Sequence, residues 1–281
     1  MPKNTKYLTV AYQGEPGAYS ETAASEYFGP AVETLGQASF EGVFRAVEDG
    51  ICQAGLIPIE NSLAGSIHVN YDLLLKHKLS VVGEYHLPVH HCLIAHPGAS
   101  LSQIRKVISH PQALAQCSGY LASLTGVASE PVYDTAGSVK LLRQSGERSV
   151  AAIASRRAAE IYEMQVLAEN IEDHPENYTR FLAVAPEPVR PGPDGKTSIV
   201  FSLQNQPGAL FKALSVFALR DIDLTKIESR PLVGRPWEYL FYIDFAGSIE
   251  EPAATRALSH LEEFATMLRV LGSYPRHHLE S

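Results

Sequence analysis

Along the first 185 residues, short apolar runs alternate with segments in which apolar residues recur at helical spacing. Short apolar runs typical of buried strands lie at 9–13, 54–59, 107–109, 150–154 and 181–185, and an extended stretch covers 81–95. Helical spacing occurs at 20–28, 40–47, 69–77, 111–124, 138–143 and 156–163. Strands separated by helices of this length predict a mostly parallel sheet with helices on both faces. A segment of about 180 residues also has room for two lobes with a cleft between them.

A proline-rich segment divides the chain. Residues 185–197 contain four prolines and two glycines, a composition typical of a stiff, extended linker. Beyond it we expect strands at 198–203, 224–229, 239–245 and 268–273, helices at 209–219 and 252–264, and a hairpin around Gly234. This βαββαβ order predicts a ferredoxin-like unit. We therefore divide the chain into a larger domain at 7–184, a linker at 185–197 and a small domain at 198–276.

Composition excludes several classes of protein. The 281 residues are 45% hydrophobic and 19% charged, with a net charge of −8 and no run of Lys and Arg, which argues against nucleic-acid binding. No apolar run reaches the roughly 18 residues of a membrane span, and the N-terminus lacks the apolar stretch of a signal peptide. Cys52, Cys92 and Cys117 are few and far apart, as expected of reduced thiols. We therefore expect a cytoplasmic protein without a membrane partner.

Four potential metal ligands share one parity on the extended stretch, namely His86, His90, Cys92 and His96. A strand rises about 3.3 Å per residue, so only adjacent members of this set could reach one ion. We therefore expect no metal site here. The motifs typical of nucleotide, flavin and serine-hydrolase sites are also missing from the sequence.

Two segments in the first third of the chain place polar groups where ligands bind in α/β proteins. Residues 14–20 read Gly-Glu-Pro-Gly-Ala-Tyr-Ser and join a strand to a helix N-terminus, whose free N–H groups favour an anion. The alternative is a plain turn in which Ser20 caps the helix. A second strand ends directly in Glu60, Asn61 and Ser62, and ligands of open α/β sheets sit at the carboxyl ends of strands. Its alternative is a loop capped by Asn61 or Ser62.

A third segment precedes the last strand of the larger domain. Thr179 offers a hydroxyl donor, Arg180 a fork that fits a carboxylate, and Phe181 an apolar face. Neighbours in a strand alternate sides, so all three face one pocket only if the backbone turns there. The alternative is an ordinary strand entry with a surface arginine.

The small domain has its own candidate site. Residues 205–211 read Asn-Gln-Pro-Gly-Ala-Leu-Phe and cross from a strand to a helix, and residues 228–231 read Glu-Ser-Arg-Pro at the end of the next strand. Together they could bind both ends of an amino acid, its carboxylate at backbone N–H groups and its ammonium at carbonyl or carboxylate oxygens. A capped turn without a ligand is the alternative.

Taken together, the segments resemble prephenate dehydratase over nearly the whole chain. The similarity rests on 14–20, 58–62, 109–114, 135–138 and 179–181, which occur in the family's order. Residues 208–210 and 228–231 resemble the phenylalanine-responsive version of an ACT domain, although Phe211 stands where an aliphatic residue is common. The resemblance implies an α/β catalytic domain of two lobes, shaped like a periplasmic binding protein, followed by a ferredoxin-like ACT domain. It also implies conversion of prephenate to phenylpyruvate in L-phenylalanine biosynthesis, without metal or cofactor, and feedback inhibition by L-phenylalanine.

The resemblance assigns roles to residues. The family's catalytic threonine falls on Thr179, and we expect its hydroxyl to assist the departing hydroxide while Arg180 binds the pyruvyl carboxylate. The further expected substrate contacts are Phe181, Asn61, Ser62, Ser109, Gln112 and Thr135. The expected phenylalanine contacts are Asn205, Pro207, Gly208, Ala209, Leu210, Phe211, Glu228, Ser229 and Arg230. A homodimer or homotetramer is implied, with phenylalanine bound where two copies meet. The alternatives are an arogenate dehydratase, with the same chemistry, and a non-catalytic amino-acid sensor on the same scaffold.

Overall fold

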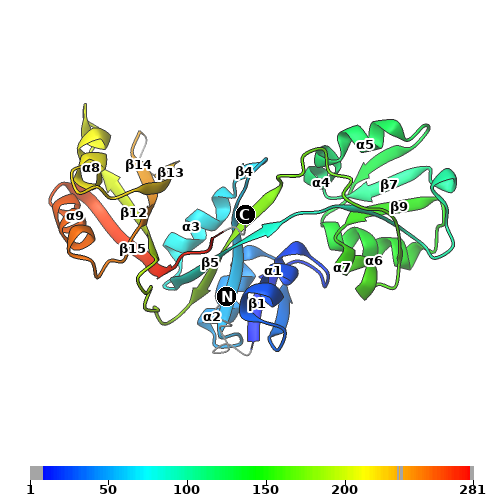
Figure 1. Cartoon of the computed structure of the whole chain (residues 1–281), viewed down its shortest axis with the longest axis horizontal. Helices are drawn as coiled ribbons and strands as arrows, with labels where there is room; N and C mark the ends of the chain where they lie inside the picture. The colour runs from blue at the N-terminus through cyan, green and yellow to red at the C-terminus, as the bar shows by residue number, and fades with distance from the viewer. Residues whose placement is uncertain (1–8, 233, 235–236, 279–281) are drawn as a thin grey trace. The chain divides into compact units, whose positions relative to one another are not determined.

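The chain folds into two compact units in a computed structural model that describes residues 9–232, 234 and 237–278 (Figure 1). Within the described residues, the first unit runs up to Ile67 and then from Tyr85 to Phe181, and the second comprises His68–Glu84 and the chain from Leu182 onward. The chain therefore leaves the first unit, returns to it and leaves it again. No helix among the described residues is long and apolar enough to cross a membrane.

A six-stranded sheet contains the first strands of the chain. Its order is β2-β1-β3-β11-β5, and β4 pairs with the end of β3. β1 is parallel to both β2 and β3, and β5 and β11 run from one unit into the other along the chain. The strands are β1 (Thr9–Gln13), β2 (Glu33–Gln37), β3 (Ala54–Asn61), β4 (Gly65–Ser66), β5 (Ser80–Pro88) and β11 (Tyr178–Ala185); the helices are α1 (Tyr19–Phe28) and α2 (Phe40–Glu48).

A five-stranded sheet forms the other part of the first unit, in the order β10-β6-β9-β7-β8. β7 is parallel to β8 and β9, whereas β6 is antiparallel to β9 and β10, so this sheet is mixed rather than mostly parallel. The strands are β6 (Cys92–Ala95), β7 (Lys106–Ser109), β8 (Ala128–Pro131), β9 (Val150–Ala154) and β10 (Gln165–Ala168). The helices are η1 (Leu101–Gln103), α4 (Pro111–Gln116), α5 (Ser118–Ser123), α6 (Thr135–Ser145) and α7 (Arg156–Ile161).

Strand β9 shows why helices cover both faces of this sheet. All five of its residues are buried, as expected of a central strand with two covered faces. Because side chains alternate, Ala152 and Ala154 join the apolar cluster that includes α6 and α7 residues, while Ala151 and Ile153 join the cluster that includes α4. The two lobes expected from the sequence are thus two sheets, each with its own helices.

The second unit contains the expected βαββαβ fold, with an antiparallel sheet in the order β13-β14-β12-β15. Phe201, Phe217 and Phe245 lie in one apolar cluster between the sheet and both helices. Helix α3 (His68–Lys76) also belongs to this unit, and the Tyr242 hydroxyl donates to the carbonyl of Tyr71 at 3.0 Å. The elements are β12 (Gly195–Leu203), α8 (Ala209–Ala218), β13 (Leu224–Pro231), β14 (Tyr239–Ala246), α9 (Pro252–Glu262) and β15 (Ala265–Pro275).

Several boundaries differ from the sequence-based expectation. β12 begins at Gly195, so the last residues of the predicted linker are strand, and β11 begins at Tyr178 rather than at Phe181. The single helix expected over 111–124 is two short helices that meet at Cys117, whose φ of −115° and ψ of 21° are not helical. β2, β8 and β10 were not predicted, since they are short, contain no fully buried residue and are weakly patterned. The hairpin expected around Gly234 includes residues 233 and 235–236, which lie outside the described residues.

Candidate active site

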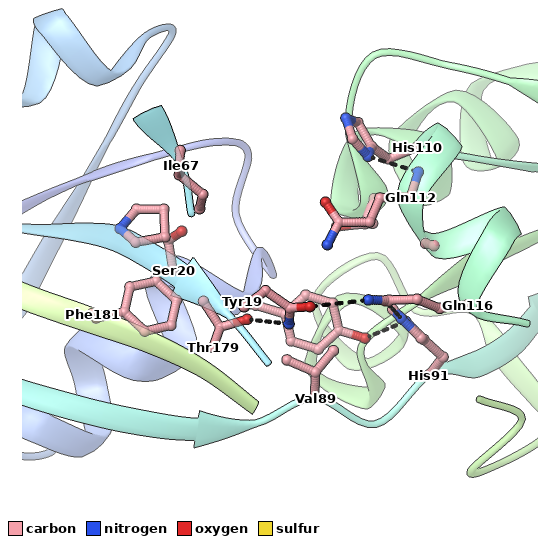
Figure 2. A pocket seen from close by; sticks show the side chains of 14 residues that line it. Tyr19, Ser20, Ile67, Val89, His91, His110, Gln112, Gln116, Thr179 and Phe181 are labelled. Carbon is pink, nitrogen blue, oxygen red and sulfur yellow. Dashed lines mark hydrogen bonds between the residues drawn. The ribbon is translucent and has the colours of Figure 1, made fainter. Parts of the chain in front are cut away.

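A cavity of about 150 Å³ lies in the first unit and is lined by residues of the six-stranded sheet and by helix and loop residues from the parts of the unit around both sheets. Figure 2 shows Thr179 and Phe181 on one side and His110, Gln112 and Gln116 on the other. Several of the lining residues lie at the end of a strand, as Asn61 does, or at the start of a helix, as Tyr19 and Thr135 do, whereas Val89 and His91 lie between β5 and β6. The full lining is Tyr19, Ser20, Pro58, Asn61, Ile67, Val89, His91, His110, Gln112, Ala113, Gln116, Thr135, Thr179 and Phe181.

Asn61 bonds to the segment that carries Thr179. It ends β3, lies next to β11 in the sheet order and is 6% exposed. Its Nδ2 lies 2.8 Å from Asn177 Oδ1, 3.1 Å from the Tyr178 carbonyl oxygen and 3.1 Å from Thr179 Oγ1. Its Oδ1 accepts from the backbone N–H groups of Leu63 at 3.1 Å and Ala64 at 2.9 Å. These backbone donors decide which end of the amide is oxygen.

The orientation of Asn61 fixes the role of the Thr179 hydroxyl. Because Asn61 Nδ2 donates to Thr179 Oγ1, the hydrogen of that hydroxyl points to some other acceptor. Thr179 lines the cavity, so a ligand there could receive it. Phe181, one pleat further along the same strand and 1% exposed, forms an apolar part of the wall.

A chain of hydrogen bonds continues from Asn61 across the cavity. Gln116 Nε2 lies 3.4 Å from Asn61 Oδ1, and Gln116 Oε1 lies 2.9 Å from His91 Nε2. His91 Nδ1 is 2.8 Å from the Tyr19 hydroxyl, which is also 2.8 Å from the His90 carbonyl oxygen. Figure 2 draws this chain from Thr179 to Tyr19. It connects β3, β11, α4 and α1 with the segment between β5 and β6.

Burial controls the protonation states of the titratable groups in and near this series of hydrogen bonds. It lowers the pKa of His91, although the bond to Gln116 and the charge of Glu172 oppose the shift, so the neutral imidazole is favoured. Burial raises the pKa of Tyr19 well above its ordinary value, which keeps the phenol protonated. Burial also raises the pKa of the Cys92 thiol to about 11 and that of Cys117 to about 12.

Two longer helices begin at the cavity wall. Tyr19 and Ser20 open α1, and Thr135 opens α6, whose first turn is capped by Asp134 accepting from Gly137 N–H at 2.8 Å. The first N–H groups of a helix have no helical acceptor, so anions are stabilised near them. Gly17, just before α1, has a φ of +90°, and a Cβ there would lie 2.6 Å from Ala158 Cα. Glycine thus permits the close approach of α1 and α7.

Three predicted substrate contacts do not line the cavity. Arg180 points to the opposite side of β11 from Thr179, is 5% exposed, and its Nη1 lies 3.4 Å from Glu60 Oε1. Ser62 Oγ donates to the Glu176 carbonyl at 3.0 Å and accepts from Tyr178 N–H at 2.9 Å, which ties β3 to β11. Ser109 is fully buried and donates to the Ile153 carbonyl at 2.6 Å. Asn61, Gln112, Thr135, Thr179 and Phe181 do line it.

Sequence reasoning missed His91 and Gln116 and gave Tyr19 no role of its own. Tyr19 and His91 are 72 residues apart in the chain, and Gln116 follows 25 residues after His91. Tyr19 lies in the segment 14–20, which was considered only as a site where backbone N–H groups could bind an anion. His91 lies between two residues considered as metal ligands, and nothing in its local pattern distinguished it. The described part of the chain holds no group of three or more His, Cys, Asp or Glu placed to bind a metal.

A second cavity, of about 120 Å³, lies in the βαββαβ fold. It brings together three of the predicted effector contacts, Asn205, Ala209 and Leu210, with Trp237 and Tyr239, which were not predicted. Pro207, Gly208 and Phe211 belong to the same turn and helix start without lining it, and Phe211 is 76% exposed. The full lining is Leu203, Gln204, Asn205, Gln206, Ala209, Leu210, Trp237, Tyr239 and Phe241.

The remaining predicted effector residues lie on β13, away from that lining. Glu228 Oε1 is 3.2 Å from His68 Nε2, and Arg230 Nη2 is 2.8 Å from Asp72 Oδ2. Both partners belong to α3, the helix that follows the cavity residue Ile67 in the chain. Ser229, between them, is exposed.

Comparisons with known proteins match both parts of the chain. A family model described as prephenate dehydratase matches residues 10–189, and one described as ACT domain matches residues 197–263. Arogenate dehydratase/prephenate dehydratase 2, chloroplastic, of Arabidopsis thaliana is 52% identical over 283 residues, covering 97% of this chain and 74% of that protein.

Two solved structures are similar over almost the whole chain. One is a prephenate dehydratase from Arthrobacter aurescens in complex with L-Phe, with a TM-score of 0.89 and 31% identity over 96% of this chain and 90% of that one. The other is GqqA, described as a novel type of quorum quenching acylase, with a TM-score of 0.88 and 37% identity over 96% of this chain and 98% of that one.

One expectation is contradicted by the comparison. The sequence led us to expect a cytoplasmic protein, but relatives from Arabidopsis thaliana are named chloroplastic. The expectation relied on the missing signal peptide and membrane span, and neither feature distinguishes the cytosol from an organelle.

Proposed function

The chain belongs to the prephenate dehydratase family, and from that premise we propose how its cavity performs the reaction, in which prephenate loses carbon dioxide and water to give phenylpyruvate. The observation that carries the proposal is the bond from Asn61 Nδ2 to Thr179 Oγ1, at 3.1 Å. It leaves the Thr179 hydrogen available to the cavity. The substrate must expel a ring hydroxyl, and a donor aimed at the departing oxygen stabilises the charge that develops there.

The two groups that leave the ring, carbon dioxide and hydroxide, explain why the protein has to supply mainly geometry and a donor to the leaving oxygen. Loss of the ring carboxylate as carbon dioxide supplies the electron pair that makes the ring aromatic while hydroxide leaves. The protein then has to hold the substrate in one orientation and assist the leaving oxygen. Phe181 provides an apolar wall, and Thr179 on the same side of β11 provides the hydroxyl. We place the ring against Phe181 with its hydroxyl toward Thr179.

The substrate carboxylates need a binding site, and Arg180 is not at the cavity wall. We propose that the pyruvyl carboxylate lies at the N-termini of α1 and α6, near Ser20 and Thr135, where free N–H groups and helix dipoles favour an anion. Gln112 is a further polar contact. The ring carboxylate is best left without a strong partner, since stabilising it in the bound substrate would slow its loss.

Incubation of the purified protein with prephenate and, separately, with arogenate tests the function. Formation of phenylpyruvate from prephenate, or of phenylalanine from arogenate, supports a dehydratase. The ratio of the two kcat/KM values assigns the preferred substrate, an open choice because the Arabidopsis thaliana relative is named for both activities. Absence of either product would contradict the proposal and favour the non-catalytic sensor. An acylase assay in parallel covers the activity described for GqqA.

The small domain is an ACT domain, and we propose that L-phenylalanine binds its cavity and inhibits the enzyme. The prephenate dehydratase from Arthrobacter aurescens was solved with L-Phe, and the cavity here is lined by Asn205, Leu210 and Trp237. The ring of phenylalanine fits the apolar lining, and Asn205 offers hydrogen bonds to the amino-acid end. Substrate must weaken phenylalanine binding by the same factor as phenylalanine weakens substrate binding.

The assembly and the division of the chain are also proposals. We propose a homodimer or homotetramer in which two ACT domains meet, because Phe211, Leu219 and Trp237 are each at least 75% exposed. Sedimentation equilibrium with and without L-phenylalanine tests the assembly, and a monomer at micromolar concentration would contradict it. We retain a catalytic domain at 7–184, a linker at 185–197 and an ACT domain at 198–276.

A further inference from the structure

The reaction consumes a proton, and the cavity offers few groups that could supply it. Prephenate is a dianion, and its products are one monoanion, carbon dioxide and water, so each turnover takes up one proton. Among the described residues that line the cavity, none is Lys, Arg, Asp or Glu. Tyr19, His91 and His110 are the titratable side chains there, and burial raises the pKa of Tyr19 too far for its phenol to be the source of the proton near neutral pH.

The hydrogen bonds of the Asn61 and Gln116 side-chain amides define the tautomer of His91. Asn61 Oδ1 accepts from two backbone N–H groups, so the side chain that faces this oxygen, Gln116, presents its Nε2. Gln116 therefore turns its Oε1 toward His91, and a carbonyl oxygen only accepts. His91 Nε2 must carry hydrogen in both the neutral and the charged imidazole. The proton that is gained or lost is the one at Nδ1.

Tyr19 accommodates both states of His91. When the imidazole is neutral, the Tyr19 hydroxyl donates to Nδ1 at 2.8 Å. When Nδ1 is protonated it donates to the phenol oxygen, and the phenol hydrogen turns to the His90 carbonyl, also 2.8 Å away. Neither state leaves a buried group unsatisfied, so a rotation of one hydroxyl makes protonation of His91 possible without other rearrangement.

The groups around His91 leave its pKa sensitive to the charge of a ligand. Glu172 Oε2 accepts from the His91 backbone N–H at 2.8 Å, and its Oε1 lies 2.8 Å from His90 Nδ1. Burial alone would raise the pKa of Glu172, but these bonds outweigh it and leave the pKa low, so Glu172 stays charged. The nearby Cys92 and Cys117 thiols stay neutral because their pKa values are raised. With burial and His90 lowering the pKa of His91, an arriving dianion is the additional charge that favours imidazolium.

We propose that His91 takes up a proton when the dianionic substrate enters the cavity and passes it through the Tyr19 hydroxyl to the departing hydroxyl oxygen. Tyr19 is then a second catalytic residue beside Thr179, and His91 is the acid behind it. The ring C–O bond breaks with its electron pair on oxygen, and the Tyr19 hydroxyl gives its hydrogen to that oxygen to form water. The Nδ1 proton of the imidazolium passes to the phenol oxygen at the same time, so Tyr19 stays protonated. The bond to the ring carboxylate breaks at the same time, and its pair enters the ring. His91 is left neutral with hydrogen on Nε2, and solvent supplies the proton that Nδ1 takes up in the next turnover. This inference rests on the proposed dehydratase function.

Measurement of the pH dependence of both kinetic constants tests the proposal. A required acid is active below its pKa and lost above it, so wild-type kcat/KM should fall about tenfold per pH unit above the lowered pKa of free His91. The corresponding fall in kcat should come at higher pH, because the bound dianion favours imidazolium. Prephenate is the probe, from about pH 5 to 9, with its spontaneous conversion subtracted.

Three variants separate a catalytic from a structural role. The fall of kcat/KM at high pH is the descending limb of the pH profile, and His91→Gln should lose this limb. His110→Gln, the matched control at the other cavity histidine, should keep the limb at the wild-type pH. Tyr19→Phe should lose it as well, since the hydroxyl that carries the proton from His91 to the substrate is gone.

The outcomes discriminate between the inference and the function on which it rests. A limb that persists unchanged in His91→Gln, or a wild-type profile without a limb, overturns the role of His91 while the dehydratase function stands. If His91→Gln does not fold by circular dichroism, a limb that persists in Tyr19→Phe overturns the inference instead. Loss of the limb in His110→Gln assigns the proton to His110 and also overturns it. No turnover of prephenate or arogenate by the wild type overturns the function itself.

Discussion

Asn61 holds Thr179 in one hydrogen-bonding orientation, with its Nδ2 3.1 Å from Thr179 Oγ1 while its own Oδ1 is occupied by the backbone N–H groups of Leu63 and Ala64. The amide therefore cannot turn over without losing two backbone bonds. Thr179 is left as a donor toward the cavity. This relationship joins a motif at the end of β3 to a motif in β11, more than a hundred residues later in the chain.

Asn61→Asp tests the orientation with little change in volume. A carboxylate cannot donate to Thr179, so the threonine hydrogen should turn to the carboxylate instead of the substrate. We expect kcat to fall by roughly a hundredfold or more, the scale found when one preorganised donor is lost, with a smaller change in KM. Ser62→Ala, at the neighbouring exposed position that does not line the cavity, is the matched control and should alter kcat much less. Equal effects of the two changes on kcat would contradict the account.

Arg180→Leu distinguishes a substrate contact from a structural one. The Arg180 side chain is buried on the face of β11 opposite Thr179 and pairs with Glu60 at 3.4 Å. We therefore expect a fall in the free energy of unfolding of about 1–3 kcal/mol, since the change removes the hydrogen bonds of a buried guanidinium, and a KM within a few-fold of wild type. Urea denaturation and steady-state kinetics on the same preparation measure both. A tenfold rise in KM with unchanged stability would restore the direct contact expected from the sequence.

Gly17→Ala should destabilise the first unit. The positive φ of Gly17 disfavours any other residue, and the added Cβ would lie 2.6 Å from Ala158 Cα, a backbone atom that cannot move alone. We expect a loss of about 2–4 kcal/mol in the free energy of unfolding, measured by denaturant titration. Gly29→Ala is a matched control, since its φ is also positive but no atom lies within 4 Å of the Cβ position. Equal losses from the two substitutions would show that the close approach contributes nothing.

Stability should depend on pH through Glu21. Burial by itself would raise the pKa of Glu21, but hydrogen bonds from Arg157, at 2.8 Å, and from Gly17 N–H outweigh it and hold the pKa below its ordinary value of 4.5. A lowered folded-state pKa contributes stability above the unfolded-state pKa, and this is lost as pH falls through the folded-state value. The free energy of unfolding should thus decrease below about pH 4.5, and less steeply in Glu21→Gln. Parallel curves for the two proteins between pH 3 and 7 would contradict this role.

Trp237→Ala should weaken inhibition by L-phenylalanine. Trp237 lines the ACT cavity together with Leu210 and Tyr239, so its removal deletes part of the wall that would cover the ligand. We expect the phenylalanine concentration for half inhibition to rise at least tenfold. Phe211→Ala, an exposed aromatic outside the cavity lining but on the surface proposed for the contact between copies, should change this concentration less than Trp237→Ala does. A shift in Phe211→Ala alone would place the effector on the helix surface instead.

The sequence was informative where local chemistry decides structure and silent where distant segments meet. Asn61 and Thr179 could be predicted because each lies in a polar motif at a strand end, and the alternation of strand residues already indicated that Arg180 and Thr179 would face opposite sides. The contact between Tyr19 and His91 could not be predicted, since it depends on how two sheets pack. Ser109 shows the converse, because a serine in a recognised motif is used to bond the Ile153 carbonyl inside the sheet.

Single-turnover release of carbon dioxide from prephenate labelled in its ring carboxylate tests the central claim most directly. With enzyme in excess, the account predicts rapid release by the wild type, release within about tenfold of that rate by Thr179→Ser, which keeps the hydroxyl, and a rate lower by a hundredfold or more for folded Thr179→Ala. Release by Thr179→Ala at the wild-type rate would contradict the claim that the Thr179 hydroxyl drives departure of the ring oxygen.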